Sequence, residues 1–388
     1  MREEDRERKT GRMKITAGLG SIDEYVRFVK AGADECFCGY VPYFWTKKYG
    51  TWAPLNRREV LCSNVQIGSE SELEILAQMV RRCQKPVHLT FNSLYYLPQQ
   101  YPEIAEIIAS CMKLGFHSFI IADPALIVYL REQKIDCEIH LSGEMGEVST
   151  GSIAVLSRLG LTRVIFHRKN TFSDMKAVTR MLTDADSGEE KQKRLMEFEA
   201  FVLNENCQFT GAFCNSFHGD EFGHLCHVPY WLAPVSRSSG RPSGTLSREL
   251  SEDRSLWKEE WERMRRKGLI DEDGTLTGYE EDKTDKTDET GETEPNEREM
   301  GDVEDGYLCG ISGCGLCALW KLQDAGITHL KLVGRGNYVD FMERDIHNLS
   351  RAREILERSA TEAEFIDRMK RELFTDGCGR SCYYWMDR

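Results

Sequence analysis

Several features that mark whole classes of protein are missing from this sequence of 388 residues. No apolar run approaches the roughly 18 to 20 residues that a helix needs to cross a bilayer. The N-terminus, Met1-Arg-Glu-Glu-Asp, has no apolar core like that of a secretory signal peptide. We therefore expect a cytoplasmic protein without a membrane span.

A block of consecutive lysines and arginines, which would point to a nucleic-acid surface, is also missing. The net charge of −13 comes from one stretch, because residues 271–305 hold 16 acidic and 3 basic side chains. The whole chain has 64 acidic and 51 basic residues, so the rest is balanced at 48 of each. The overall acidity therefore does not argue against an RNA partner.

Common catalytic patterns are absent as well. No glycine-rich loop for a dinucleotide or a phosphate follows the first apolar run. The sequence shows no Ser/His/Asp order, no convincing Cys/His pair and no His-Glu-x-x-His helix. A hydrolytic function would therefore need a mechanism that the sequence does not display.

What the chain does have is a regular alternation of short apolar runs with helix-like stretches, beginning at Met13. Such alternation is typical of βα units and a parallel sheet. Eight such runs predict a TIM-like (β/α)8 barrel, with an open doubly wound sheet as the main alternative. Ser21 is the expected N-cap of the first helix. The expected strands cover residues 14–19, 35–39, 87–92, 118–122, 137–142, 163–167, 200–204 and 329–334.

The alternation is interrupted before the last expected strand. A Pro/Ser/Gly-rich loop and a charged helix candidate suggest an insertion, and the acidic stretch after it is too polar to bury a core. The expected organisation is a disordered leader (1–12), barrel strands one to seven (13–231), the insertion (232–278), a disordered acidic segment (279–305), the last barrel unit (306–358), and a C-terminal helix with a Cys-containing tail (359–388).

Six of the 14 cysteines cluster in two glycine-rich segments on either side of this interruption. Thiolates suit soft metals, and the glycines allow the backbone to fold around one. An iron–sulfur cluster is the favoured interpretation, with zinc or no metal as alternatives. Cys378 and Cys382 raise the number of cysteines in this half of the chain to eight, enough for two four-cysteine sites. Alternatively, they are incidental thiols of a flexible tail. We expect the others, Cys36, Cys38, Cys62, Cys83, Cys111 and Cys137, to lie in the core.

Polar residues close several of the expected strands, at the end of a barrel where enzymes of this fold keep their chemistry. His140 and His167 are candidates for acid/base catalysis, and Arg168 and Arg335 for binding a carboxylate or phosphate. The alternative is a structural role, as satisfied strand ends or a salt-bridged rim. His218 and His224 are candidates to contact the metal ligands. Asn92, Asp123, Glu144 and Lys331 are the other polar residues in such positions.

Taken in order, five motifs resemble those of the collagenase-like peptidase family U32. Together they cover roughly residues 13–356, apart from the interruption. The motifs are Ile120-Ile-Ala-Asp-Pro-Ala-Leu-Ile, Glu138-Ile-His-Leu-Ser142, Leu161-Thr-Arg-Val-Ile-Phe-His-Arg168, Glu199-Ala-Phe-Val with Cys207 and Cys214, and Ala325-Gly-Ile-Thr-His-Leu-Lys-Leu-Val-Gly-Arg335.

The resemblance implies a TIM-like barrel. It also implies a [4Fe-4S] cluster, because the better-understood members hold one through four cysteines and support hydroxylation of tRNA, of ribosomal RNA or of a quinone precursor. Three ligands would correspond to Cys207, Cys214 and Cys226. The fourth would be Cys317, with Cys314 and Cys309 as alternatives. A partner protein of the same family also fits the resemblance.

The sequence departs from the family pattern at three loops of the expected mouth, which read Thr16-Ala-Gly-Leu-Gly20, His167-Arg-Lys-Asn170 and Leu332-Val-Gly-Arg335. Three functions follow as hypotheses. The first is an Fe–S barrel enzyme that supports hydroxylation of RNA or of a prenylated small molecule bound in the mouth. The second is a peptidase, and the third is a non-catalytic, metal-stabilised partner protein.

Overall fold

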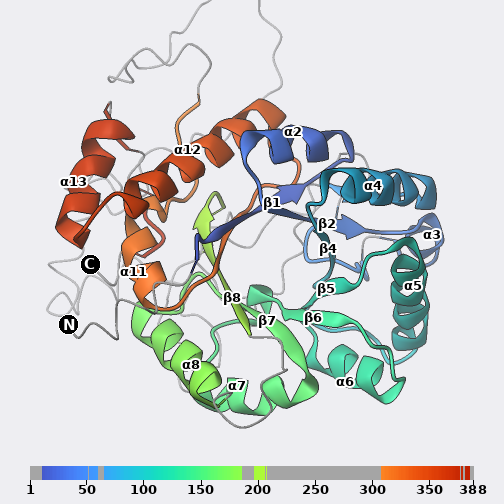
Figure 1. Ribbon diagram of the computed structural model, residues 1–388. Coiled ribbons are helices and arrows are strands. Elements are labelled where there is room, and N and C mark those ends of the chain that lie inside the picture. The colour runs from blue at the N-terminus through green and yellow to red at the C-terminus, as the bar shows by residue number, and fades with distance from the viewer. Residues whose placement is uncertain are drawn as a thin grey trace, which may run out of the picture. The chain divides into compact units, whose positions relative to one another are not determined.

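A closed barrel of parallel strands surrounded by helices forms the body of the computed structural model shown in Figure 1. The structure describes residues 11–50, 52–59, 65–185, 196–205, 207, 307–375, 377–378 and 381–384. The expected leader up to residue 10, the insertion and the acidic segment lie outside the described residues. No helix of the described part is long and apolar enough to cross a membrane.

Eight strands form the barrel, and every pairing between them is parallel. The ring closes because β1 pairs with both β2 and β9. All eight expected strands and the (β/α)8 barrel are thereby confirmed, whereas the short β3 (Gln66–Ile67) beside β2 was not predicted. The barrel strands are β1 (Lys14–Leu19), β2 (Glu35–Tyr40), β4 (Val87–Phe91), β5 (Ser118–Ile121), β6 (Glu138–Leu141), β7 (Leu161–Phe166), β8 (Glu197–Leu203) and β9 (His329–Leu332).

Helices cover the outside of the barrel, as Figure 1 shows. Their apolar stripes bury leucine, isoleucine and phenylalanine against the strands, which supplies most of the hydrophobic stabilisation. They are α2 (Asp23–Ala31), α3 (Tyr43–Tyr49), α4 (Glu70–Cys83), α5 (Gln100–Leu114), α6 (Pro124–Glu132), α7 (Thr150–Leu156), α8 (Phe172–Ala185), α11 (Leu319–Asp324), α12 (Val339–Glu357) and α13 (Glu362–Glu372).

Local sequence determines where several helices begin. The Ser69 hydroxyl accepts from the Glu72 backbone N–H and the Glu72 carboxylate accepts in return from Ser69, a capping box that starts α4. The expected N-cap at Ser21 is wrong, because α2 begins at Asp23 after Ile22, without a side-chain cap. The Glu24 carboxylate instead reaches back to accept from the Gly20 N–H at 2.7 Å.

Early cysteines serve the core, as expected for small apolar side chains. Cys36, Cys38, Cys111 and Cys137 are buried and Cys83 is partly buried, while Cys62 lies outside the described residues. The five described thiols do not line the cavity described below.

Candidate functional site

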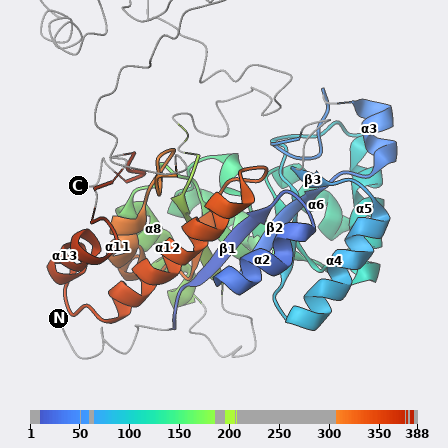
Figure 2. The same cartoon turned by 90° about the horizontal axis from the view of Figure 1, so that it is seen from above.

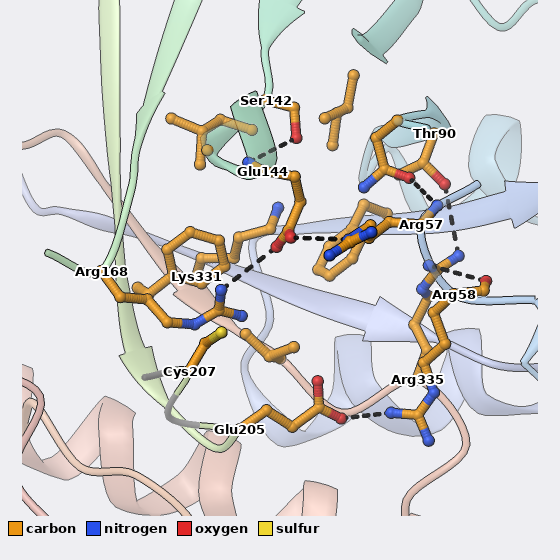
Figure 3. Close-up of a pocket in the computed structure, with 17 residues that line it drawn as sticks. Arg57, Arg58, Thr90, Ser142, Glu144, Arg168, Glu205, Cys207, Lys331 and Arg335 are labelled. Atoms are coloured by element: carbon orange, nitrogen blue, oxygen red, sulfur yellow. Dashed lines mark hydrogen bonds and ion pairs between the residues drawn. The ribbon is translucent and has the colours of Figure 1, made fainter. Parts of the chain in front are cut away.

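A cavity of about 350 Å³ opens at the carboxyl ends of the barrel strands. It is lined by side chains from most of the ring, which converge on one space in Figure 3. The lining residues are Phe37, Arg57, Arg58, Thr90, Asn92, Ile120, Ser142, Gly143, Glu144, Ile165, Arg168, Phe201, Glu205, Cys207, Lys331, Val333 and Arg335.

Strand ends supply most of the polar lining, because all strands of a parallel barrel end at the same rim. Asn92, Glu144, Arg168, Lys331 and Arg335, which close or follow expected strands, all line the cavity. The sixth such residue does not. Asp123 is the N-cap of α6, where its carboxylate accepts from the Ala125 N–H at 2.8 Å and the Tyr96 N–H at 3.1 Å.

Positive charge exceeds negative charge among the lining residues. Four arginines, Arg57, Arg58, Arg168 and Arg335, line the cavity together with the carboxylates of Glu144 and Glu205, while the fifth lining cation, Lys331, pairs with the buried Glu199. Glu144 lies between two of the arginines, 3.3 Å from Arg168 Nη1 and 3.7 Å from Arg57 Nε. Glu205 pairs with Arg58 at 2.5 Å. The surplus makes the cavity suitable for an anionic ligand.

Arg168 is held in a defined orientation at one wall. Its guanidinium lies 4.0 Å from the centre of the Phe201 ring, a cation–π contact. Burial disfavours its charge, but Glu144 together with Tyr383, Cys207 and Glu205 outweighs burial and raises the Arg168 pKa above its usual value. A planar cation fixed by stacking loses little entropy when it binds a carboxylate or phosphate.

Arg335 and Lys331 come from the last strand and the turn after it. Arg335 donates to Thr90 Oγ1 at 3.4 Å and to the Arg58 carbonyl at 3.3 Å. Burial and the neighbouring Arg58 lower the Arg335 pKa. Lys331 Nζ lies 3.6 Å above the Phe37 ring, and burial lowers its pKa. Since burial penalises both charges, a bound anion would relieve that penalty.

Below the cavity, the barrel interior contains a compensated ion network. Arg163, 1% exposed, lies within 3.0 Å of carboxylate oxygens of Glu35, Glu197 and Glu199. Lys331 Nζ completes the network by donating to Glu199 at 2.7 Å. Burial opposes the charge of Glu199, but Lys331 and Arg163 outweigh it and lower its pKa to about 2. Lys14 Nζ lies 3.2 Å from Glu35 Oε1, so that three cations face the three carboxylates. The network therefore fills the barrel with matched charge and links its centre to the cavity.

The structure separates the two histidine candidates from the cavity lining. His140 is buried inside the barrel, with its ring centre 4.6 Å from that of His88, and its Nδ1 has no hydrogen-bond partner. Burial and His88 lower its pKa well below the usual value, so the ring is neutral. His167 is buried behind Arg168, and its Nδ1 accepts from the Lys169 N–H at 3.2 Å. Arg168 and Arg335, by contrast, both face the cavity.

The two cysteine-bearing segments are brought together despite the long separation between them. The Asn204 N–H donates to the Gly313 carbonyl at 2.9 Å, and the Gly315 N–H donates to the Val202 carbonyl at 2.6 Å. Cys207 follows directly after this pairing and reaches the cavity lining (Figure 3). A ligand set that joins Cys207 to the segment carrying Cys317 is therefore compatible with the chain path.

The metal ligands themselves are only partly described. Cys214 and Cys226, together with His218 and His224, lie outside the described residues. Within the described part of the chain, no group of three or more His, Cys, Asp or Glu side chains is placed to hold a metal ion. Cys207, Cys309, Cys314 and Cys317 are partly buried there.

Residues 381–384 also reach this region. Cys382 pairs with Cys314 in a parallel β-bridge, because the Cys314 N–H donates to the Ser381 carbonyl at 2.7 Å and the Tyr383 N–H donates to the Cys314 carbonyl at 2.9 Å. Tyr384 donates its hydroxyl to the Phe201 carbonyl at 2.8 Å. Cys382 is therefore a neighbour of Cys314, which places a thiol from the end of the sequence beside the expected metal-binding segment.

Sequence reasoning missed part of the lining. Arg57 and Arg58 lie well beyond the end of β2, after α3, in a segment without apolar periodicity. Hydrogen bonds from Ser93 and Tyr96 to the carbonyls of Pro54 and Leu55 hold this segment over the mouth. The adjacent pair of arginines in a long βα connection is the signal that could have identified them.

Comparison with known proteins places this geometry in context. A search of curated proteins matches "tRNA hydroxylation protein P" of Escherichia coli (strain K12), 28% identical over 108 residues. The match spans 28% of this chain and 20% of that protein, so the chain covers about one fifth of its relative's length.

Among solved structures, the U32 peptidase Mk0906 superimposes with a TM-score of 0.35 and 13% identity, covering 50% of this chain and 70% of that one. The putative copper homeostasis protein CutC from Streptococcus agalactiae gives a TM-score of 0.33 and 12% identity, covering 49% and 89%. We draw no functional conclusion from these two superpositions. A family model matches far more of the sequence, from residue 20 to residue 378, and the chain therefore belongs to Peptidase family U32.

Proposed function

We propose that this chain is an iron–sulfur barrel protein that supports hydroxylation of RNA at the mouth of the barrel. The observation that carries the proposal is the cavity at the carboxyl ends of the strands, where four arginines face two carboxylates and Cys207 forms part of the wall. The partial match to a tRNA hydroxylation protein supports RNA as the substrate class.

The surplus of positive charge fits a polyanion. Arg168 and Arg335 lie on different strand ends, so together they can bind two oxygens of a phosphate or two neighbouring phosphates. Arg57 and Arg58 add charge from the loop above. A prenylated small molecule, the other substrate considered, would gain less from so many cations because most of its surface is apolar.

Four thiolates are the donor set expected for a [4Fe-4S] cluster. In this proposal Cys207, Cys214, Cys226 and Cys317 hold it, with Cys314 or Cys309 as alternative fourth ligands. The hydrogen bonds between residues 202–205 and 312–315 support it, because they keep Cys207 and Cys317 on neighbouring segments. When bound, such a cluster would supply one-electron chemistry at the cavity wall.

The chain's own polar residues would then position the substrate. Arg168 and Arg335 would orient it through its phosphates, and Glu144, held between Arg57 and Arg168, is a carboxylate available to accept a proton. Lys331 donates to Glu199 and is the lining amine closest to the buried network. His140 and His167 would stabilise the fold rather than contact the substrate, since neither lines the cavity.

A peptidase is the main alternative, in keeping with the family's name. The lining includes Ser142 and Cys207 as candidate nucleophiles, but no histidine is among the lining residues of the described part. Neither nucleophile therefore has an imidazole base beside it in the cavity. A non-catalytic role as a metal-stabilised partner is the third hypothesis.

Metal analysis separates these hypotheses first. Protein purified without oxygen should contain iron and acid-labile sulfide in a near four-to-four ratio, and stoichiometric zinc without iron would overturn the cluster. Cys207→Ser should lose the iron. Cys111→Ser, at a buried core thiol, is the matched control and should retain it.

The substrate is tested by comparing RNA from cells with and without the gene. Mass spectrometry of nucleosides should show one species that is heavier by one oxygen atom only where the intact gene is present. Restoration of that species by wild type but not by Arg168→Met would support the cavity as its site. Unchanged RNA together with peptide cleavage by the purified protein would favour the peptidase, and RNA turnover only with a second protein would favour the partner role.

A further inference from the structure

Exposed aromatic side chains are unevenly distributed over the described residues. On α4, α6 and α7 the largely exposed apolar side chains are aliphatic, namely Ile75, Val128 and Val155. All largely exposed aromatic side chains of the described residues instead follow the carboxyl ends of β2, β4 or β9. They are Tyr43 (75% exposed), Phe44 (50%), Trp52 (64%), Tyr95 (70%) and Tyr338 (79%).

The strands that carry them form one arc of the ring, since β9, β1, β2 and β4 are consecutive neighbours. The same arc supplies Arg57, Arg58, Lys331 and Arg335 to the cavity. Figure 2 shows α3, the first element after β2, lying beyond the ends of α4 and α5. Exposed rings and cations therefore follow the same arc of strands, although Tyr43 and Phe44 line a separate cavity with residues of α4 and α5.

Trp52 and Tyr95 lie on two segments that both supply residues to the cavity lining and that hydrogen-bond to each other. Trp52 belongs to the same segment as Arg57 and Arg58, and Tyr95 to the same loop as Asn92. The two segments are joined, because the Ser93 hydroxyl donates to the Pro54 carbonyl at 2.6 Å and the Ser93 N–H donates to the Leu55 carbonyl at 3.3 Å.

Both segments are also tied to the barrel. The buried Tyr96 hydroxyl donates to the Leu55 carbonyl at 2.6 Å, and the Tyr96 N–H donates to Asp123 at 3.1 Å. On the other side the Trp45 indole donates to the Ala53 carbonyl at 3.1 Å. Packing among the described residues does not explain why large apolar rings stay exposed on well-anchored backbone, and exposed aromatics on a rigid support are suited to binding.

We propose that Trp52 and Tyr95 form a stacking platform for the bases of single-stranded RNA that enters the cation-lined cavity. The proposal rests on the function proposed above and adds the residues that receive the nucleotides next to the modified one. Aromatic faces accept any base, while the adjacent arginines neutralise the backbone, a combination typical of single-stranded nucleic-acid sites. Stacking of this kind contributes about 1–3 kcal/mol per base.

The test measures binding of a fluorescent single-stranded RNA of mixed sequence, roughly 12 nucleotides long, to the full chain purified without oxygen. Trp52→Ala and Tyr95→Ala should each weaken binding about 5- to 100-fold, which corresponds to the loss of one stacked base. Trp52→Phe and Tyr95→Phe should restore most of the affinity, because a ring face remains. Val155→Ala, an exposed apolar change on an outer helix, is the control and should bind like wild type.

Salt dependence separates stacking from charge. The slope of log affinity against log salt concentration should be unchanged in Trp52→Ala and Tyr95→Ala but smaller in Arg58→Gln. If wild type binds the RNA and both alanine variants bind it equally well, the stacking platform is wrong while the RNA function stands. If wild type does not bind single-stranded RNA at all, both proposals are overturned together.

Discussion

Charged side chains are paired with one another inside the barrel, whereas positive charge is in excess at its mouth. Inside, Arg163 is surrounded by carboxylates of Glu35, Glu197 and Glu199, and Lys331 pairs with Glu199. At the mouth, Arg57, Arg58, Arg168 and Arg335 share only Glu144 and Glu205. Matched charges satisfy one another and need nothing from outside, whereas surplus charge at a cavity is suited to a ligand. The first region therefore stabilises the fold, and the second is suited to bind an anionic ligand.

The largest effect is expected in the interior. Arg163→Met would leave three carboxylates without their shared partner in a buried setting, which should lower the free energy of unfolding by about 3–5 kcal/mol. Urea denaturation measures the loss. Arg168→Met at the mouth is the comparison and should cost far less stability, because Glu144 keeps its contact with Arg57. Equal losses in the two variants would remove the distinction between the regions.

A second test concerns Glu59, a buried carboxyl group behind the mouth that accepts from the Asn56 N–H at 2.6 Å. Burial raises its pKa from 4.5 to about 7, so the folded state holds the proton more tightly than the unfolded state. Its contribution to stability is fully present below pH 4.5 and is lost as the pH rises to about 7, by roughly 3 kcal/mol.

Glu59→Gln, which cannot ionise, should flatten the dependence of unfolding free energy on pH between about 4.5 and 7. Denaturant titrations at several pH values measure it. The exposed change Glu74→Gln on α4 is the control and should leave the curve as in wild type. A wild-type stability that rises over the same pH range would show that the surplus cations of the mouth keep Glu59 ionised.

A third test removes one cation from the mouth. Arg168→Met should weaken binding of single-stranded RNA by about 1.5–3 kcal/mol, roughly 10- to 100-fold, and reduce the salt slope by about 0.7 for one lost phosphate contact. Arg168→Lys should recover the slope but only part of the affinity, since it keeps the charge and loses the planar stacking on Phe201. Glu144→Gln should not weaken binding. An unchanged slope in Arg168→Met would place the RNA elsewhere.

The smallest expected effect is at the outer wall of the mouth. Tyr384→Phe removes the hydrogen bond to the Phe201 carbonyl and should cost about 1 kcal/mol of stability. Tyr338→Phe, at a ring that is 79% exposed, is the control and should cost nothing measurable. Equal melting temperatures for wild type and Tyr384→Phe would mean that residues 381–384 contribute little to the wall.

The strands could be predicted because each βα unit repeats the same pattern of an apolar run followed by a helical stripe. The polar residues at their ends could be predicted to meet, since parallel strands end at one rim, and five of the eight do so. Asp123 is one exception, because a carboxylate before Pro124 caps a helix better than it faces a cavity. The other two are His140 and His167, whose rings are buried away from the lining.

The rest depended on tertiary contacts. The interior network could not be predicted because a lone charge in a strand gives no sign of its partner. Only the register shows that Arg163 lies beside Glu197 on the next strand. Arg57 and Arg58 were missed because hydrogen bonds to a loop about 40 residues further on bring them over the mouth. The exposure of Trp52 and Tyr95 could not be predicted either, since an aromatic residue in a loop is as often buried as exposed.

The pairing of Cys314 with Cys382 has a consequence for biosynthesis. A ribosome releases a chain from its beginning, so β1 to β8 can pack while the last part is still being made. The end of β8 can pair with residues 312–315 only after those residues emerge. Residues 312–315 can in turn pair with residues 381–384 only after these have followed. The wall that carries the thiols is thus the last part of the barrel to be completed. A metal cofactor placed there would be loaded only after residues 381–384 have emerged, and a chain stalled before residue 381 would have a closed barrel but an unfinished site.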